Sequence, residues 1–222
     1  MEWPASKLTT TVGTGAARAR QPQPRTASRR DDILVAAADV FAARGYHNAS
    51  LQEIAERVDM TRAGVLHHFG SKEQLLTQVL EYRDQADVVE FEGHRAPTGI
   101  RLLLHLVYTA ADNQLRPGIV QSYAVLCAEA VTEDHPAQAW FRNRYEVVRG
   151  MVRDALREAA AAEVPPTDSE IEAATLAITA VMDGLQIQWL LQPGSVDMPA
   201  TVEFVIRNIL SQWGIHLPSP EA

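Results

Sequence analysis

The chain has 222 residues, 46% of them hydrophobic, and carries a formal net charge of −8. This length allows one or two globular domains with a substantial core. The single cysteine, Cys127, excludes an internal disulfide and favours a reducing compartment. We find neither a charge-free apolar run of about 18 residues nor the apolar core of a signal peptide. We therefore expect a cytoplasmic protein with no membrane span.

The acidic total conceals an uneven distribution of charge. Residues 1–72 contain 10 basic and 7 acidic side chains, whereas residues 73–222 contain 10 basic and 21 acidic ones. A basic segment on an acidic body is typical of a protein that docks on phosphates through one end only. The negative total therefore does not exclude DNA binding.

Residues 1–27 are rich in Thr, Ala, Gly, Pro, Gln and Arg without periodicity, which predicts a disordered arm. A solvated tail is the favoured interpretation, although five arginines in or beside the arm could reach DNA: Arg18, Arg20, Arg25, Arg29 and Arg30. Ser28 and Asp31 match a capping box. Apolar residues at helical spacing follow, so a first helix is expected to begin at Ser28 and end at Gly45.

The segment from Ser50 to Phe69 predicts two short helices joined by a tight turn. Ser50 and Glu53 match a capping box, apolar residues follow at i, i+3, i+4 and i+7, and Thr61 can cap the second helix. Two such helices describe a DNA-binding helix-turn-helix, although an ordinary helix pair can mimic the spacing. The residues expected to contact DNA lie on the exposed face of the second helix or at helix starts: Ser50, Thr61, Arg62, Ala63, His67, His68 and Lys72.

The residues around this segment, FAARGYHNASLQEIAERVDMTRAGVLHHFGSKEQLL, resemble the N-terminal domain of the TetR family of one-component transcriptional regulators. The resemblance runs over about residues 32–80. Two positions depart from the family pattern: Asp59 stands where the turn usually has Gly, and Leu66 stands where a Tyr commonly contacts a phosphate. The resemblance implies a homodimeric regulator that binds a palindromic operator and an unknown small-molecule ligand.

The remainder of the chain also predicts helices. Ser71 and Gln74 match another capping pattern, which opens a helix to about Glu92. Thr167 and Glu170 match a further one. With these starts and the Pro and Gly breaks, helices are expected at about residues 98–113, 117–131, 136–162, 167–191 and 197–213. The total is an all-α fold of nine helices, divided into an arm (1–27), a DNA-binding domain (28–72) and a ligand-binding and dimerisation domain (73–217).

The last two expected helices are the most apolar, which indicates burial on more than one side. The resemblance implies that they pair with their copies in a four-helix bundle; the alternative is the core of a monomer. Three residues are expected at that interface: Leu176, Trp189 and Phe204. Residues that combine apolar bulk with a polar group are the candidates for the ligand: Tyr108, Tyr123, Trp140, Tyr145 and Gln186. The helix from Lys72 to about Glu92 is expected to carry the signal, as the only continuous rigid link to the DNA-binding domain.

Enzymatic function is not indicated, because H-E-x-x-H, Walker A and G-x-S-x-G motifs are missing. His67 and His68 are adjacent and point in different directions on a helix, so no metal site is expected. Cys127 lies among apolar residues and is expected to be inert. No cofactor is expected. A DNA-bound scaffold without a ligand and a helix-turn-helix DNA-processing enzyme remain as alternatives, and repression is favoured over activation.

Overall fold

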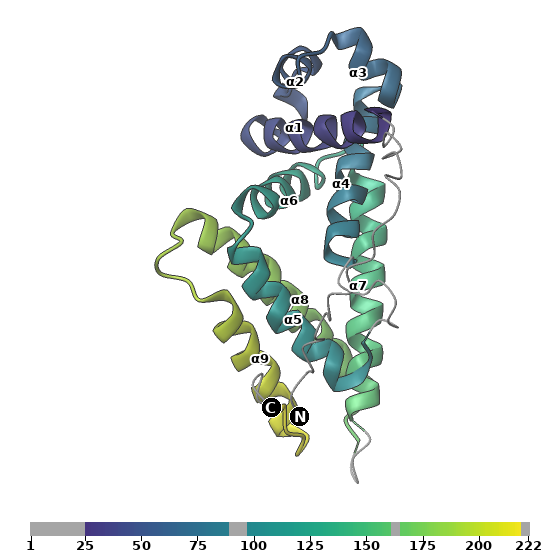
Figure 1. The fold of residues 1–222 in the computed structure, drawn as a ribbon. Helices are drawn as coiled ribbons and strands as arrows, with labels where there is room; N and C mark the ends of the chain where they lie inside the picture. The colour runs from purple at the N-terminus through teal and green to yellow at the C-terminus, as the bar shows by residue number, and fades with distance from the viewer. Residues whose placement is uncertain (1–24, 89–96, 161–164, 219–222) are drawn as a thin grey trace, which may run out of the picture.

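A computed structural model describes residues 25–88, 97–160 and 165–218 of the chain (Figure 1). The arm predicted at residues 1–27 lies almost entirely outside these ranges. The described residues fold into helices with no strand among them, which confirms the predicted all-α class. The described ranges contain nine helices: α1 (Arg25–Asn48), α2 (Leu51–Arg57), α3 (Arg62–Phe69), α4 (Lys72–Val88), α5 (Gly99–Gln114), α6 (Pro117–Glu129), α7 (Gln138–Ala159), α8 (Asp168–Leu191) and α9 (Met198–Gln212).

Local capping chemistry accounts for most helix starts. Thr167 accepts a hydrogen bond from the backbone of Glu170, whose side chain returns to the cap, so the predicted capping box is complete. Ser50 caps α2 as expected, but it accepts from the Gln52 amide, so the predicted box with Glu53 is wrong. Glu53 pairs with Arg57 one turn later, at 3.3 Å.

Helix α1 departs from the prediction at both ends. It begins at Arg25, three residues earlier than expected, and the assignment continues to Asn48 across a break at Gly45. Gly45 has φ 70° and ψ 174°, a conformation that residues with a Cβ rarely adopt. The predicted stop at this glycine therefore exists as a sharp change of direction, after which the chain makes one more turn and enters α2.

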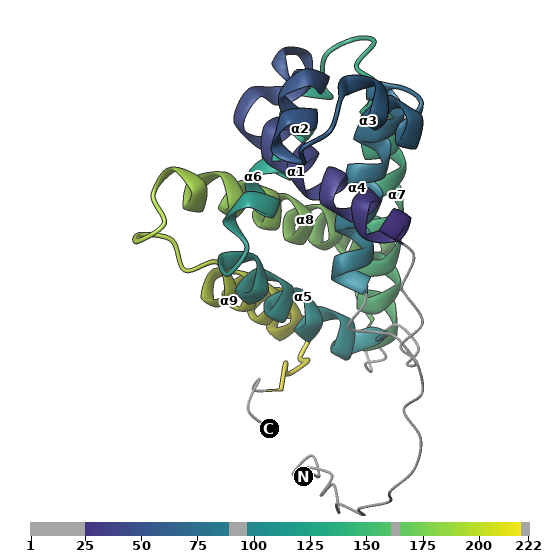
Figure 2. The ribbon, with the colours of Figure 1, turned by 45° about the horizontal axis from the view of Figure 1, so that its top comes forward.

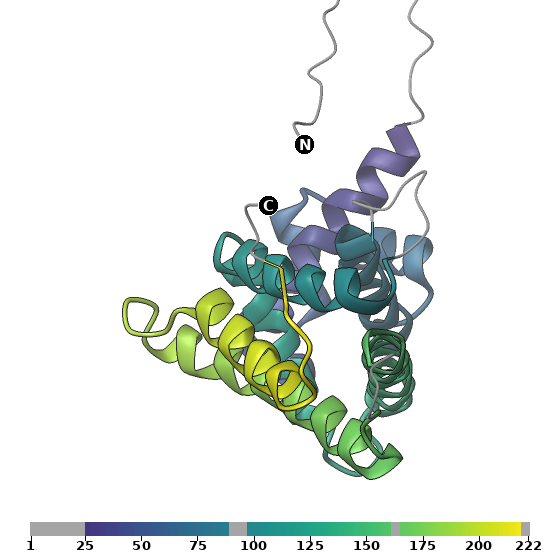
Figure 3. The same ribbon diagram turned by 90° about the horizontal axis from the view of Figure 1, so that it is seen from below.

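The helices form a head (α1–α3) and a body (α5–α9), which pack on each other and are joined by α4. In Figure 1, α2 and α3 lie at one end of the molecule on α1, while α5, α8 and α9 lie together at the other end. Helix α6 runs beneath α1, and the two share extensive contacts. Figure 2 shows the same arrangement after a turn of 45°. Figure 3, from below, shows α9 beside α8 and α5.

Two hydrophobic clusters fill the fold. One joins the buried faces of α1 to α4 with residues of α6 and α7, including Leu126 and Phe141. The other joins α5, α7, α8 and α9 around side chains such as Leu156 and Ile206. The first cluster crosses from head to body, so α6 packs directly on the head, in addition to the continuous link through α4. Helix α6 is a second connection.

Candidate DNA-binding face and candidate ligand cavity

Helices α2 and α3 form the helix-turn-helix, and side chains at their starts fix the geometry. Thr61 caps α3 by accepting a hydrogen bond from the Gly64 amide at 3.1 Å. Asp59, in the turn, has φ 52°. Gly adopts this left-handed conformation most easily, and Asp tolerates it better than most residues do. The departure at Asp59 therefore leaves the turn intact.

The outer face of α3 is open, while its inner face is part of the core. Val65 and Phe69 are buried, and Leu66 packs partly against the same cluster. The four predicted contact residues at its outer face are exposed: Thr61, Arg62, Ala63 and His67. Ser50, at the start of α2, is exposed too. These positions give α3 a donor-rich outer surface of a kind that can enter a major groove.

His68 and Lys72 are less exposed than the other predicted contacts. The His68 ring lies 6.4 Å from Phe69, and the His68 carbonyl accepts a hydrogen bond from Arg30. Lys72 Nζ lies 4.5 Å from the centre of the Tyr46 ring and donates to the His47 carbonyl at 3.4 Å. Partial burial lowers the pKa of Lys72, while Glu73 and Glu129 oppose that shift. Lys72 is therefore held in place at the start of α4.

Two arginines considered with the basic arm brace the head instead. Arg30 lies 4.5 Å from the centre of the Phe69 ring and also bonds Gln78. Arg29 donates to the Val58 carbonyl at 3.1 Å. These contacts tie α1 to both helices of the helix-turn-helix, so neither side chain is placed to act as part of a flexible arm.

A polar network that no sequence pattern indicates lies next to this face. Tyr46 donates its hydroxyl proton to Glu73 at 2.9 Å, and burial, with this hydrogen bond, raises the pKa of Tyr46 to about 12. The Tyr46 amide donates to Glu129 of α6 at 2.6 Å. His135 packs edge-on against Tyr46, with ring centres 5.3 Å apart. Two of these partners of Tyr46, Glu129 and His135, are more than 80 residues away in the sequence.

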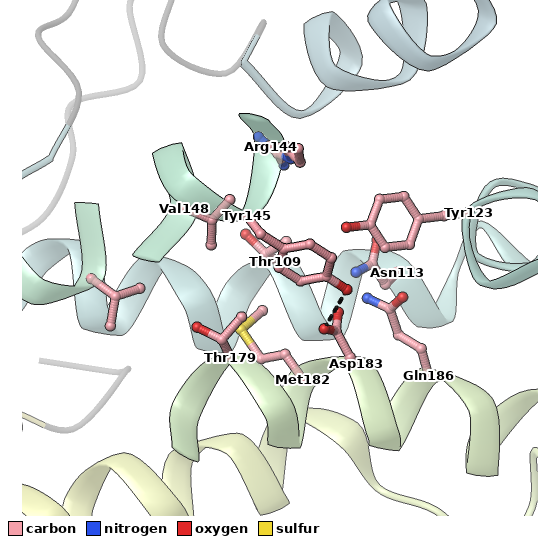
Figure 4. Close-up of a pocket in the computed structure, with 11 residues that line it drawn as sticks. Thr109, Asn113, Tyr123, Arg144, Tyr145, Val148, Thr179, Met182, Asp183 and Gln186 are labelled. Atoms are coloured by element: carbon pink, nitrogen blue, oxygen red, sulfur yellow. Dashed lines mark hydrogen bonds between the residues drawn. The ribbon is translucent and has the colours of Figure 1, made fainter. Parts of the chain in front are cut away.

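A cavity of about 80 Å³ lies between α5, α6, α7 and α8 in the body (Figure 4). Tyr145 donates its hydroxyl proton to Asp183 at 2.7 Å, and this hydroxyl is also 3.3 Å from Cys127 Sγ. Burial, with these two hydrogen bonds, raises the pKa of Tyr145 far above its usual value, so its hydroxyl stays protonated. Val148 and Met182 contribute apolar walls. The cavity can thus hold an apolar group beside fixed polar atoms.

Three of the five candidate ligand residues line this cavity: Tyr123, Tyr145 and Gln186. The other two do not. Tyr108 is 45% exposed, and Trp140 packs edge-on against Phe141, with ring centres 4.9 Å apart. The sequence also gave no reason to choose the polar lining residues Asn113 and Asp183, because nothing in the local pattern distinguishes them from solvated positions.

The predicted interface residues divide into two kinds. Leu176 is 45% exposed on α8 and Phe204 is 65% exposed on α9, so both can meet a partner. Trp189 is only 6% exposed and belongs to the core of the single chain, so its placement at the interface is wrong. Ile187 and Leu191, on the same helix, are exposed instead. Four large apolar side chains therefore face outward from the last two helices.

Helix α8 is unusually apolar for an outer helix. Within the described ranges it is the one helix whose length and composition would allow it to cross a membrane. This is weak evidence for a membrane span, because core helices of globular proteins have the same length and composition. Its buried residues pack against α6, α7 and α9. The fold therefore uses α8 as a core helix with one outward apolar face.

Comparison with known proteins agrees with this geometry. Residues 33–79 match the family described as "Bacterial regulatory proteins, tetR family", and residues 101–213 match "BetI-type transcriptional repressor, C-terminal". The HTH-type transcriptional regulator AcrR of Shigella flexneri is 24% identical over 203 residues, which cover 88% of this chain and 94% of that protein. The HTH-type transcriptional regulator TtgR of Pseudomonas putida is 28% identical over 193 residues, which cover 83% and 90%.

Solved structures show the same fold. The crystal structure of a transcriptional regulator from Rhodococcus sp. superposes with a TM-score of 0.67 at 19% identity, covering 86% of this chain and 99% of that one. The two matched segments together span the helix-turn-helix and almost all of the body. The family consists of transcriptional regulators, which are not enzymes. This chain belongs to the TetR family of DNA-binding transcriptional regulators.

Proposed function

We propose that the protein is a homodimeric, cytoplasmic repressor that binds a palindromic operator through two copies of α3 and leaves it when a small molecule occupies the body cavity. The open outer face of α3 above a buried inner face is the observation that carries this proposal. The match of residues 101–213 to a repressor C-terminal domain favours repression over activation.

The charge distribution supports separate roles for the two parts of the chain. Residues 28–72 are proposed as the DNA-binding domain and residues 73–217 as the ligand-binding and dimerisation domain. The acidic body is repelled by phosphates, so the molecule approaches DNA with its head. A single α3 of eight residues reads few base pairs. Two copies related by a two-fold axis read two half-sites and multiply the affinity.

Arg62 is the proposed base-reading residue. It is exposed at the first position of α3. The N-terminal residues of a recognition helix are the ones that contact base edges in the major groove. Its guanidinium can bond guanine through two hydrogen bonds at once. Ser50 and Lys72 are proposed to hold phosphates at the starts of α2 and α4, with His67 as a further outer contact. His68 has a mainly structural role in this proposal.

The cavity is the proposed ligand site, lined by Tyr123, Tyr145 and Gln186. Its volume of about 80 Å³ is below the range of roughly 300–1,000 Å³ that encloses a drug-sized molecule. A ligand of that size must therefore widen the space between α6, α7 and α8 as it binds. This requirement supplies the mechanism, because a ligand that prefers the widened body shifts the population away from the DNA-binding arrangement.

Selection of DNA from a random duplex pool tests the DNA-binding part directly. The full-length protein is expected to enrich an inverted repeat whose half-sites are separated by about one helical turn or a multiple of it. Protein with Arg62→Ala is expected to lose the preference at one base pair in each half-site. Enrichment of no sequence, or of a single asymmetric site, would contradict a dimeric operator reader.

A further inference from the structure

Helix α6 touches both the cavity and the entrance to the helix-turn-helix. At the cavity, it contributes Tyr123 to the lining, and Cys127 Sγ is 3.3 Å from the Tyr145 hydroxyl. At its last residue, Glu129 accepts a hydrogen bond from the Tyr46 amide at 2.6 Å. Tyr123, Cys127 and Glu129 lie on one continuous α-helix. Because a helix this short moves as a rigid unit, a shift of α6 at the cavity also moves Glu129.

The contact at Glu129 requires an unusual local structure in α1. A Cβ placed on Gly45 would lie 2.0 Å from Glu129 Oε1, a distance that no side chain could occupy. Gly45 also has φ 70°, so its lack of a side chain serves both the turn and the approach of the carboxylate. The break at Gly45 exposes the Tyr46 amide, which an unbroken helix would use internally.

The residues around Glu129 bind the same short stretch of chain. His135, in the connection from α6 to α7, has a fully buried side chain whose Nε2 lies 3.8 Å from Glu129 Oε2. Its ring packs on both Tyr46 and His47. Tyr46 then meets Lys72 at the start of α4. Held in this way, residues 45–48 fix where α2 begins, and α2 carries α3.

We propose that Glu129 is a positioning residue: through its hydrogen bond to the Tyr46 amide, α6 holds the helix-turn-helix in its DNA-binding placement and couples it to the cavity. The proposal rests on the proposed function, in that the α6 face at Tyr123 and Cys127 moves when the cavity widens. Displacement of α6 then withdraws the carboxylate and releases the start of α2. Glu129 lies at the end of α6 and acts on the head through the Tyr46 amide.

The sign of the effect distinguishes this role from simple electrostatics. Removing an acidic side chain from a DNA-binding protein strengthens binding when only long-range charge matters. Loss of the positioning contact weakens it. Glu129→Ala is therefore expected to bind the selected operator roughly tenfold more weakly, the scale of one lost charge-assisted hydrogen bond. Glu129→Gln keeps an acceptor oxygen and is expected to restore most of the affinity.

Glu133→Ala is the matched control, because Glu133 is exposed on the same connection and carries the same charge. Its affinity is expected to equal or slightly exceed that of the wild type. Operator affinity of Glu129→Ala within twofold of this control would overturn the proposal.

Amide hydrogen exchange of the full-length protein without DNA provides the second measurement. Glu129→Ala is expected to accelerate exchange at residues 45–58 and to leave α8 and α9 unchanged. An equal acceleration in α8 and α9 would make Glu129 a general stabiliser and refute the positioning role. Since this measurement needs no operator, it reports on the Glu129 contact even if the wild-type protein selects no DNA, an outcome that would refute the proposed function alone.

Discussion

Truncating Phe204 should separate the two protomers. The side chain is 65% exposed in the single chain. With about 200 Å² for a whole aromatic side chain, roughly 130 Å² remains for a partner to cover. At about 25 cal/mol per Å² this area is worth ~3 kcal/mol, of which ~2 kcal/mol is lost on truncation to alanine. A symmetric dimer contains two copies, so Phe204→Ala raises the dimer dissociation constant by as much as about a thousandfold.

Sedimentation equilibrium over a range of protein concentrations measures this constant. Val131→Ala is the matched control, because Val131 is 79% exposed but lies in the connection from α6 to α7, outside α8 and α9. The control is expected to keep the wild-type dissociation constant. If Phe204→Ala changes the constant by less than threefold, the interface does not include this face of α9, and the reasoning from exposed apolar area fails.

Four further predictions concern the core, the DNA-binding face and the junction. Trp189→Ala should cost about 3–5 kcal/mol of unfolding free energy, the usual cost of emptying a core site, and leave the dissociation constant of the remaining folded dimer near that of the wild type; monomers at full stability would return Trp189 to the interface. Arg62→Ala should weaken binding to the operator far more than to base-substituted variants in competition assays, with a loss of about 1–3 kcal/mol of discrimination per site; equal weakening on every sequence would make Arg62 a phosphate contact. Lys72→Ala should reduce the slope of log K against log salt by about one per protomer, and an unchanged slope would remove Lys72 from the phosphate contacts. Burial, opposed by Glu129 and reinforced by His47, lowers the pKa of His135 from 6.5. The unfolded chain, in which the pKa of His135 is near 6.5, therefore binds a proton more readily than the folded one. The melting temperature should fall as pH drops below 6.5, and His135→Asn should flatten that fall. Identical pH profiles of the two proteins would refute this role of His135.

Local patterns predicted the helices well because their ends are set by neighbouring residues. Thr167 with Glu170, and Thr61 at the start of α3, satisfy backbone groups within one turn. Such chemistry is visible in the sequence at a spacing of three. The error at Ser50 is small by comparison, since the cap exists and only its partner differs.

The cavity and the junction depend on contacts that no local pattern encodes. Asp183 meets Tyr145 from another helix, 38 residues away, and Glu129 meets Tyr46 across 83 residues. Their spacing in the sequence carries no signal, so they were missed. The packing of α1 on α6 was missed for the same reason.

The misplacement of Trp189 has a different cause. Helices α8 and α9 are apolar on most sides, and periodicity cannot say which apolar face meets the chain's own core and which meets a partner. Only packing resolves this ambiguity, burying Trp189 and leaving Phe204 outside. Trp189 and Phe204 are both large aromatic residues on apolar helices, so residue type alone does not tell which of them is buried in the single chain.

The most direct test of the account is the affinity and stoichiometry of the purified protein on its selected operator. Sedimentation velocity should give two chains per palindromic duplex. Fluorescence anisotropy at one fixed salt concentration should give binding at least about a thousandfold tighter than to a scrambled duplex of equal length. Equal affinity for the two duplexes, or one chain per duplex at saturation, would contradict a dimeric operator-reading regulator.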